Sequence, residues 1–340
     1  MKKKVLVIRF SSIGDIIQCM SIIEPVKFQL EAELHWVCRK DFSQMLSTNP
    51  NIDKIWSFDK KTGFKGLVKI ISLLRKEKYD YIYDAHQNIR STIIKVLMGM
   101  VWYNPKIKLA IRSKQYLRRF CFFRLKIKSA LEMPFRAVKS FQKPLLKWGI
   151  DFSKQYNTDW QFASDVIEKG KELVGDALEN NKCITIVPSA AWELKRWPIS
   201  YWKQLVQKMP DYLFIIIAGP DDTFTQEIEA VAKERIINLS GKTSLQESFY
   251  VISKSHFVIS ADTGFLHAAD LFKIKAIALM GPTAFGHPSG ETVTVLERNE
   301  LTCRPCTKAG DTKCKLVGNY RACLLDITPD LVIKTVEETF

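Results

Sequence analysis

Residues 256–269 read His-Phe-Val-Ile-Ser-Ala-Asp-Thr-Gly-Phe-Leu-His-Ala-Ala, an apolar, β-branched run that leads through Asp262-Thr263-Gly264 into a helical pattern. This order predicts a buried strand, a tight turn and a helix start. Such a turn directs backbone N–H groups and the positive end of a helix toward one point, which suits a phosphate group. Asp262 can accept hydrogen bonds from sugar hydroxyls, and His267 lies about one helical turn further on. The same pattern also fits an aspartate N-cap followed by a histidine in the core.

Strand-like and helix-like patterns alternate on both sides of this stretch. We expect strands at 5–10, 34–38, 54–58, 79–84 and 107–111, and helices at 15–30, 64–78, 89–100 and 135–148. After a polar segment at 149–160 the alternation resumes. Strands are then expected at 183–188, 213–218, 236–239, 257–260 and 276–280, and helices at 198–208, 223–233, 245–254, 264–272 and from 328 onward. The repeated βαβ order predicts an α/β protein with two halves, each built on a parallel sheet. Ligands of such sheets bind outside the carboxyl ends of the strands.

Length and composition exclude several protein classes. A chain of 340 residues has room for two domains of ordinary size, and its 46% hydrophobic content is that of a globular protein rather than a disordered one. No apolar run approaches the ~20 residues that span a bilayer. The basic and apolar start at 1–10 resembles a signal peptide, but Arg9 interrupts the apolar stretch and no small-residue cleavage site follows. We therefore expect a first strand and a cytoplasmic protein.

The net charge of +15 is concentrated in one tract. Residues 85–131 contain eleven lysines and arginines and no acidic residue, with aromatic residues interleaved. A basic surface with aromatic wedges attracts nucleic acid or an anionic membrane. The alternative is a solvated basic face whose aromatic side chains lie in the core. Either interpretation predicts an acidic partner.

The eight cysteines form two groups. Cys19, Cys38, Cys121 and Cys183 stand in apolar contexts and are expected to be small buried residues. The spacing C-x2-C-x7-C-x8-C joins the other four near the C-terminus: Cys303, Cys306, Cys314 and Cys323. In a reducing compartment four clustered cysteines are candidate ligands of a structural zinc ion, and reduced or redox-labile thiols are the alternative.

Four further loops carry charged or flexible residues directly after expected strands. The first strand leads into Ser11-Ser12-Ile13-Gly14-Asp15, where Asp15 could act as a general base or simply complement a helix dipole. In the second half, Lys195 and Arg196 could neutralise a departing diphosphate, although Arg196 could instead stack on an aromatic ring. Residues 218–222 and 280–283 follow two other strands of the same expected sheet. Four loops at one sheet edge predict a binding site.

Together these segments resemble glycosyltransferase family 9, the lipopolysaccharide heptosyltransferases of Gram-negative bacteria. The matching segments occur in the family's order over nearly the whole chain: 11–16, 49–54, 79–80, 84–90, 195–198, 262–264 with His267, 281–283 and the C-terminal cysteines. The resemblance implies a GT-B architecture of two facing Rossmann-like domains. It places an acceptor-binding domain at 1–155 and a nucleotide-sugar-binding domain at 156–340. It also implies metal-independent, inverting transfer of a heptose, typically from ADP-heptose, to the inner core of lipopolysaccharide (lipid A–Kdo or heptose).

The resemblance also implies roles for individual residues. Asp15 is expected to be the catalytic base, and Lys195 the cation on the donor phosphates. The donor is expected to contact Asp262, Thr263, Gly264, His267, Gly281, Thr283 and Ser189, and the acceptor Ser12, Gly14 and Arg90. Two positions depart from the family pattern. Ala190-Ala191 replace glycine or hydroxyl residues, and Asp270 replaces a small apolar residue.

The expected partners are a nucleotide-diphosphate sugar, a phosphorylated glycolipid acceptor and the anionic cytoplasmic face of the inner membrane, but no nucleic acid. One alternative function is that of another GT-B enzyme, which would transfer or epimerise a different nucleotide sugar. The other is a basic nucleic-acid-binding module, which would leave the Asp-Thr-Gly and Lys-Arg-Trp-Pro loops unexplained.

Overall fold

The computed structural model describes residues 2–98, 107–179, 182–316, 318 and 320–339. Its contacts divide the chain into two compact units. Unit 1 comprises Met1–Gln115 and Val138–Phe162, and unit 2 comprises Tyr116–Ala137 and Ala163–Phe340. This division differs from the boundary expected at 155/156, because residues 116–137 leave the first half and pack in unit 2. There the ring of Phe285 makes edge contacts with Phe135, at 4.8 Å between centroids, and with Phe123, at 5.9 Å.

Unit 1 is built on a five-stranded sheet in which all strand pairs are parallel. The strand order is β3-β2-β1-β4-β5. The strands are β1 (Lys3–Ile8), β2 (Ala32–Arg39), β3 (Lys54–Phe58), β4 (Tyr81–Asp84) and β5 (Lys108–Ile111). All five strands predicted for this half are present, and β1 lies at the centre. The loops after β1 and β4 therefore leave the sheet side by side.

The helices of unit 1 agree less closely with the prediction. They are α1 (Ile13–Met20), α2 (Ile23–Leu30), α3 (Ser43–Leu46), α4 (Gly63–Lys76), α5 (Ile89–Leu97) and α7 (Ala137–Gln142). The single helix predicted at 15–30 is wrong, because α1 ends at Met20 and a second helix, α2, begins at Ile23. Pro25 has no N–H to continue the helical ladder, and the break places it in the first turn of α2, where that N–H is not needed. The end of the helix predicted at 89–100 lies outside the described residues.

Unit 2 contains a six-stranded sheet, also parallel throughout, in the order β11-β10-β9-β6-β7-β8. Its strands are β6 (Cys183–Val187), β7 (Leu213–Ile216), β8 (Ile236–Asn238), β9 (Phe257–Ala261), β10 (Lys275–Met280) and β11 (Val293–Glu297). Its helices are α6 (Tyr116–Phe123), α8 (Ser164–Val174), α9 (Ile199–Lys208), α10 (Thr225–Glu229), α11 (Leu245–Lys254), α12 (Gly264–Leu271), α13 (Ala322–Leu325) and α14 (Pro329–Thr339). The sequence patterns did not predict β11, α6, α8 or α13.

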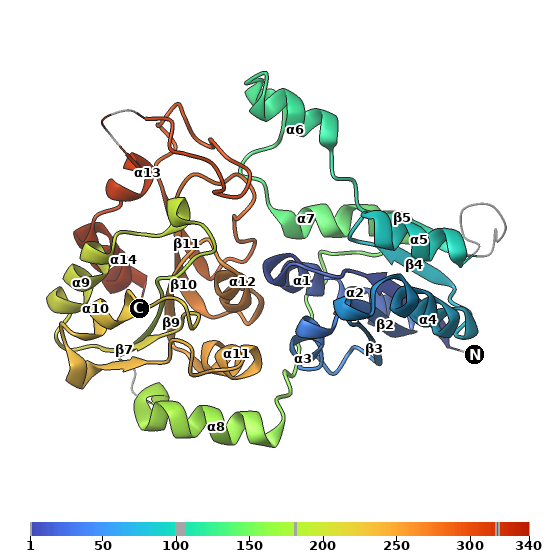
Figure 1. The fold of residues 1–340 in the computed structure, drawn as a ribbon, viewed down its shortest axis with the longest axis horizontal. Coiled ribbons are helices and arrows are strands. Elements are labelled where there is room, and N and C mark those ends of the chain that lie inside the picture. The colour runs from blue at the N-terminus through green and yellow to red at the C-terminus, as the bar shows by residue number, and fades with distance from the viewer. Residues whose placement is uncertain (1, 99–106, 180–181, 317, 319, 340) are drawn as a thin grey trace. The chain divides into compact units, whose positions relative to one another are not determined.

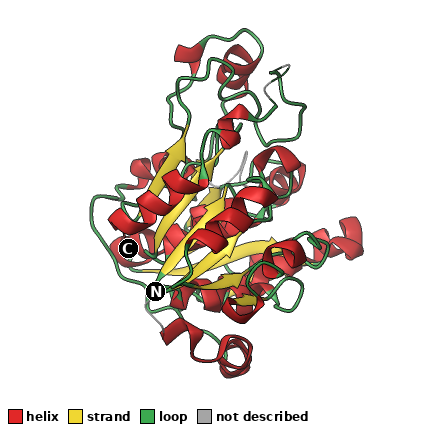
Figure 2. Ribbon diagram, turned by 90° about the vertical axis from the view of Figure 1, so that its left-hand side faces the viewer, coloured by secondary structure: helices red, strands yellow, loops and turns green. Residues whose placement is uncertain are grey.

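Helices cover the unit 2 sheet in two groups. Helix α9 packs against α10 and α14, while α11 packs against α8 and α12. Figure 1 shows α9 and α14 on one side of β9 and β10, and α11 and α12 on the other. Figure 2 shows in yellow the strands that these helices enclose. The α/β class with two parallel sheets is therefore confirmed. Among the described residues, no helix is long and apolar enough to cross a membrane.

Candidate active site

The loops after three neighbouring strands in unit 2 meet at Asp262. This residue directly follows β9, in the middle of the sheet, and is only 6% exposed. Lys195, from the loop after β6, places its Nζ 2.9 Å from Asp262 Oδ2. Thr283, after β10, donates a hydrogen bond from Oγ1 to the same oxygen at 2.6 Å. Three loops predicted to converge on one edge are thus joined at a single carboxylate.

The electrostatics of this group keep Asp262 ionised. Burial raises the pKa of a carboxyl group, but here Lys195 and His267 act against burial by their charge, and Thr283 by its hydrogen bond. The net pKa of Asp262 lies below its ordinary value. The buried carboxylate is therefore available as an acceptor for ligand hydroxyls, with a cation directly beside it.

Two glycines let backbone approach these side chains closely. A Cβ at Gly286 would lie 2.1 Å from the carboxylate carbon and Oδ1 of Asp262, so only glycine fits there. Gly310 has φ +88°, and a Cβ on it would come within 2.7 Å of Lys195 Cγ. The loop segments around Gly286 and Gly310 therefore lie against Asp262 and Lys195, respectively.

The Asp-Thr-Gly turn begins α12, as predicted, but Asp262 is not its N-cap. Thr263 is the N-cap residue, and its Oγ1 accepts a hydrogen bond from the N–H of Leu266 at 3.4 Å. This corrects the alternative of an aspartate cap and leaves Asp262 to its ion pair. Gly264 is the first helical residue, and His267 is buried one turn later, close enough to act electrostatically on Asp262. The turn thus keeps the features expected of a phosphate site.

Ser189 and Arg196 contact the neighbouring Asp222 rather than Asp262. Ser189 donates its hydroxyl to Asp222 Oδ2, and the N–H of Gly219 donates to the same oxygen at 2.9 Å. Arg196 pairs with Asp222 Oδ1 at 3.2 Å and stacks 5.2 Å from the ring centroid of Phe224. The stacking alternative for Arg196 is therefore confirmed, and its role as a phosphate cation finds no support in these contacts.

Gly281 directly follows β10 and is tightly packed. A Cβ there would lie 3.0–3.3 Å from the side chain of Leu324. Its carbonyl oxygen accepts a hydrogen bond from Nε of the buried Arg304 at 2.8 Å. The contacts of Gly281 are thus with the protein's own interior. Asp270, one of the departures from the family pattern, accepts hydrogen bonds from the N–H groups of Ser289 and Gly290, at 2.7 and 2.6 Å, and so fixes the far end of the 281–290 loop.

In unit 1, Asp15 lies in the first turn of α1, beyond the carboxyl end of β1. Its Oδ2 lies 2.6 Å from Arg9 Nη2, and its Oδ1 lies 3.7 Å from Arg112 Nη1. Ser12 donates its hydroxyl to Asp15 at 3.1 Å. The Asp15 side chain is 37% exposed, whereas both arginines are buried. Its carboxylate is therefore oriented by the protein on one side and accessible on the other.

The sequence analysis did not identify Arg9 and Arg112 as site residues. Arg9 Nη1 donates to the carbonyl of Ala85 at 2.7 Å, and Arg112 Nε donates to Ser140 Oγ at 2.8 Å. Both guanidinium groups lie over the ring of Phe141, and burial lowers the pKa of Arg112. One signal was available: each arginine immediately follows a strand, at the edge where Asp15 was placed.

The other residues expected on the acceptor side lie along the same sheet edge. Gly14 is within α1, and its carbonyl accepts from Gln18 Nε2 at 3.2 Å. Arg90 is exposed at the start of α5, after β4, with its guanidinium 5.7 Å from the ring centroid of Phe58. The loop before it is anchored at the buried Asp84, which pairs with Lys95 at 2.6 Å.

Folding buries some of the described residues of the basic tract at 85–131. Lys95 and Arg112 are buried in ion pairs, and Phe122 is buried. Trp102, Tyr103 and Lys106 lie outside the described residues. The exposed basic and apolar residues that can be described are concentrated instead at 116–128. Phe122 follows the alternative in which the aromatic residues lie in the core, whereas Phe120 is exposed, and the acidic partner stays a prediction.

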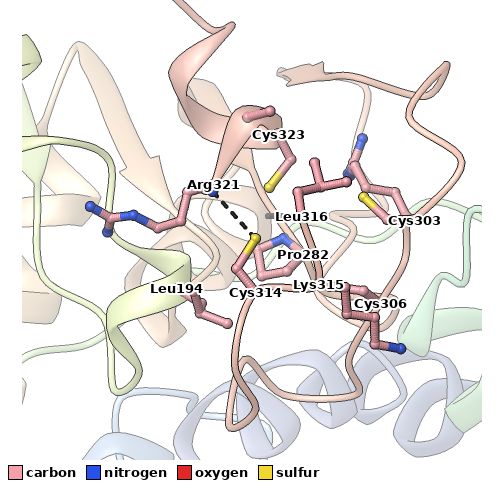
Figure 3. Close-up of a pocket in the computed structure, with 11 residues that line it drawn as sticks. Leu194, Pro282, Cys303, Cys306, Cys314, Lys315, Leu316, Arg321 and Cys323 are labelled. Atoms are coloured by element: carbon pink, nitrogen blue, oxygen red, sulfur yellow. Dashed lines mark hydrogen bonds between the residues drawn. The ribbon is translucent and has the colours of Figure 1, made fainter. Parts of the chain in front are cut away.

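The four C-terminal cysteines line one small cavity of about 10 Å³, close to Leu194 and Pro282 (Figure 3). Burial raises the pKa of Cys306, and it raises that of Cys323 to about 11, so these thiols are protonated at neutral pH. Within the described ranges, no group of three or more histidine, cysteine, aspartate or glutamate residues is arranged to hold a metal ion. The residue types suit zinc but this arrangement does not, and a structural zinc stays a prediction.

The remaining cysteines largely follow expectation. Cys19, Cys38 and Cys183 are buried, and burial raises the pKa of each thiol to about 12. Cys121 is only partly buried, which corrects the expectation for that residue. It lies in α6, a helix with a single buried residue.

Comparison with known proteins gives a consistent result over most of the chain. The model of a family described as glycosyltransferase family 9 (heptosyltransferase) matches residues 67–316. The lipopolysaccharide core heptosyltransferase OpsX of Haemophilus influenzae is 23% identical over 281 residues, covering 78% of this chain and 76% of that protein.

Solved structures show the same fold. A glycosyl transferase family 9 protein from Veillonella parvula has a TM-score of 0.77 at 18% identity, covering 100% of this chain and 98% of its own. The E. coli heptosyltransferase WaaC, solved with ADP-2-deoxy-2-fluoro heptose, has a TM-score of 0.66 at 17% identity and covers 99% and 100% of the two chains.

Proposed function

The chain belongs to glycosyltransferase family 9, and from this membership we propose that it transfers a heptose from ADP-heptose to the inner core of lipopolysaccharide, at lipid A–Kdo or a heptose. The observation that carries the proposal is the buried Asp262–Lys195 pair beside the start of α12. The names of similar proteins support it, since OpsX is a lipopolysaccharide core heptosyltransferase and WaaC was solved with an ADP-heptose analogue.

The donor site is proposed to lie in unit 2. The N–H groups of Thr263 and Gly264 and the positive end of α12 would bind the diphosphate, with His267 alongside. Asp262 would accept hydrogen bonds from the sugar hydroxyls. Lys195, 2.9 Å from that carboxylate, carries the positive charge that stabilises the departing diphosphate.

The acceptor is proposed to bind unit 1, where Asp15 acts as general base. The acceptor hydroxyl gives its proton to the Asp15 carboxylate while its oxygen bonds to the anomeric carbon of the donor sugar. The bond from that carbon to the diphosphate oxygen breaks, and its electron pair leaves with the nucleoside diphosphate. Attack opposite to the leaving group inverts the anomeric configuration. We propose that Lys195 and the α12 amides supply the charge stabilisation, so that the step requires no metal ion.

Donor binding provides the test of this function. A ligand that binds only the folded state stabilises it by an amount that grows with occupancy, about 2.7 kcal/mol at one hundred times Kd. ADP-heptose is therefore expected to raise the melting temperature more than UDP- or GDP-sugars at equal concentration. Stabilisation by a UDP- or GDP-sugar alone would favour the alternative, a different GT-B enzyme. Mass spectrometry of the products with a short core acceptor identifies the reaction.

We also propose that the segment 116–128 binds the anionic face of a membrane. Leu117 and Phe120 in α6 are 75% and 55% exposed, and Leu125 and Ile127 are exposed after it. The same segment carries five basic side chains, at 118, 119, 124, 126 and 128, and no acidic one. Each basic residue near an anionic lipid surface contributes roughly 1 kcal/mol of attraction.

Vesicle sedimentation tests this surface. We expect binding to vesicles of anionic lipid and little binding to zwitterionic ones, with a strong decrease at high salt. Leu117→Glu should weaken vesicle binding about tenfold, since it removes an apolar anchor and adds a negative charge that the anionic lipid repels. Leu146→Glu, a similarly exposed leucine outside the segment, is the matched control. Equal binding by both variants would rule out this docking surface.

A further inference from the structure

A second cavity in unit 2 has no role in the function described so far. It has a volume of about 330 Å³ and lies between residues 122–134 and the segments that follow β10 and β11. Thr283 lines it, and the same Thr283 donates its hydroxyl to Asp262. The cavity therefore begins next to the carboxylate proposed to hold the donor sugar.

One wall of this cavity carries a buried charge network. Glu297 Oε2 lies 2.9 Å from both His287 Nε2 and Arg304 Nη2, and its other oxygen accepts from Asn299 Nδ2 at 3.0 Å. Burial raises the pKa of Glu297, but the hydrogen bond and charge of His287, the amide of Asn299 and the charge of Arg304 outweigh it and bring it to about 2. The ionised Glu297 holds the side chains of His287 and Arg304 in place and pairs with one nitrogen of each.

One further nitrogen of each side chain is left without a partner. Arg304 is 8% exposed and His287 is 5% exposed, and both line the cavity. Arg304 Nη1 and His287 Nδ1 are buried and have no hydrogen-bond partner in the structure. Buried polar groups are nearly always hydrogen-bonded, so an unpaired guanidinium nitrogen at a cavity wall indicates a polar ligand.

The charge and shape of the cavity define that ligand further. Its lysine, arginine and glutamate lining groups are Lys128, Arg304 and Glu297, two cationic and one anionic, which leave one net positive charge. The opposite lining includes Phe122 and Met133, whose apolar surfaces suit the C–H face of a sugar ring. An unsubstituted heptose has no negative charge to place here, and the donor phosphates already have Lys195. The chemistry fits a sugar ring that carries an acid.

We propose that this cavity is an acceptor subsite that binds a sugar unit bearing a carboxylate or phosphate, with Arg304 Nη1 and Lys128 Nζ as the anion-binding groups. His287 Nδ1 pairs with a hydroxyl of the same unit. The assignment rests on the proposed transferase function, since it names part of the acceptor. It adds that unit 2, through residues 122–134, takes part in selecting that acceptor.

Direct binding tests the subsite independently of turnover. The probes are the methyl glycoside of 3-deoxy-octulosonic acid, its neutral carboxamide, and a methyl heptoside phosphate, titrated against the full chain by calorimetry. At least one acidic probe is expected to bind tenfold or more tightly than the carboxamide, because charge-assisted hydrogen bonds are about twice as strong as neutral ones. Whichever acidic probe binds more tightly identifies whether the subsite recognises a carboxylate or a phosphate.

Lys128→Ala should weaken binding of that acidic probe about tenfold and leave carboxamide binding unchanged. Lys128 is exposed, so this variant keeps the buried network intact. Arg124→Ala, an exposed arginine of the same segment that does not line the cavity, is the matched control. Equal binding of acid and carboxamide by the unaltered protein would overturn the proposal. So would a Lys128→Ala variant with unchanged acid binding, or one whose affinity for ADP-heptose falls instead. If no ADP-sugar stabilises the unaltered protein, the transferase function fails, while the titrations still decide the subsite.

Discussion

Replacing Asp15 with asparagine is expected to lower kcat for sugar transfer by about 10²- to 10⁴-fold, the range typical of a lost general base. Asparagine keeps the size of the side chain and a hydrogen-bond acceptor for Arg9, but it cannot take the proton of the acceptor hydroxyl. The affinity for ADP-heptose should be unchanged, because the donor groups belong to unit 2. Steady-state kinetics and a donor titration measure the two effects separately.

Asparagine is a sharper test than alanine at this position. Asp15→Ala leaves the buried guanidinium groups of Arg9 and Arg112 without their shared carboxylate, so lost stability would accompany lost chemistry. Asp41→Asn, an exposed aspartate of the same unit, is the matched control. If Asp15→Asn turns over at the rate of the unaltered enzyme, Asp15 is not the base.

Replacing Lys195 with alanine is the second large effect expected. Removing one preorganised charge from a developing anion typically costs about 10²- to 10³-fold in kcat. The donor should also bind more weakly, because the same ammonium faces the ground-state diphosphate. Lys171→Ala, on the exposed surface of α8, controls for the loss of one positive charge from unit 2. An unchanged kcat in Lys195→Ala would remove Lys195 from the catalytic machinery.

The same substitution should change how stability depends on pH. The pKa of Asp262 lies below its ordinary value in the folded protein, so the folded state gains stability above the unfolded-state pKa and loses it as pH falls. Without Lys195 that contribution shrinks, because a major charge that lowers the Asp262 pKa is gone. Melting temperatures of Lys195→Ala and the unaltered protein should therefore differ most near neutral pH and converge in acid. The double variant Lys195→Ala/Asp262→Asn should recover part of the lost stability.

Much of the fold could be predicted because strand signals are local. Every predicted strand is present, since short β-branched runs bounded by turn residues identify buried parallel strands. The strand β11 was missed because Val293–Glu297 lies at the sheet edge, where its mixed side chains are only partly buried. Helix α8 was missed because most of its residues are polar and it buries only a few, among them Val166 and Val174.

Part of the candidate site could be predicted from the sequence, because some of its charged residues stand directly after expected strands. Asp15 and Asp262 were identified because each stands in a turn directly after an apolar strand, at the edge where parallel sheets bind ligands. Arg196 was assigned two roles, and only its packing on Phe224 and its pairing with Asp222 separated them.

By itself, the sequence determined two α/β halves, the order of their strands along the chain and the acidic residues at the strand ends, because these depend on neighbouring residues. Only the tertiary structure decided which groups meet: Arg9 and Arg112 on Asp15, Lys195 on Asp262, and residues 122–134 at the cavity with Arg304. Such contacts join residues far apart in the chain, and no local pattern encodes them. They arise because the strand order places particular loops together and burial then requires each charged group to find a partner.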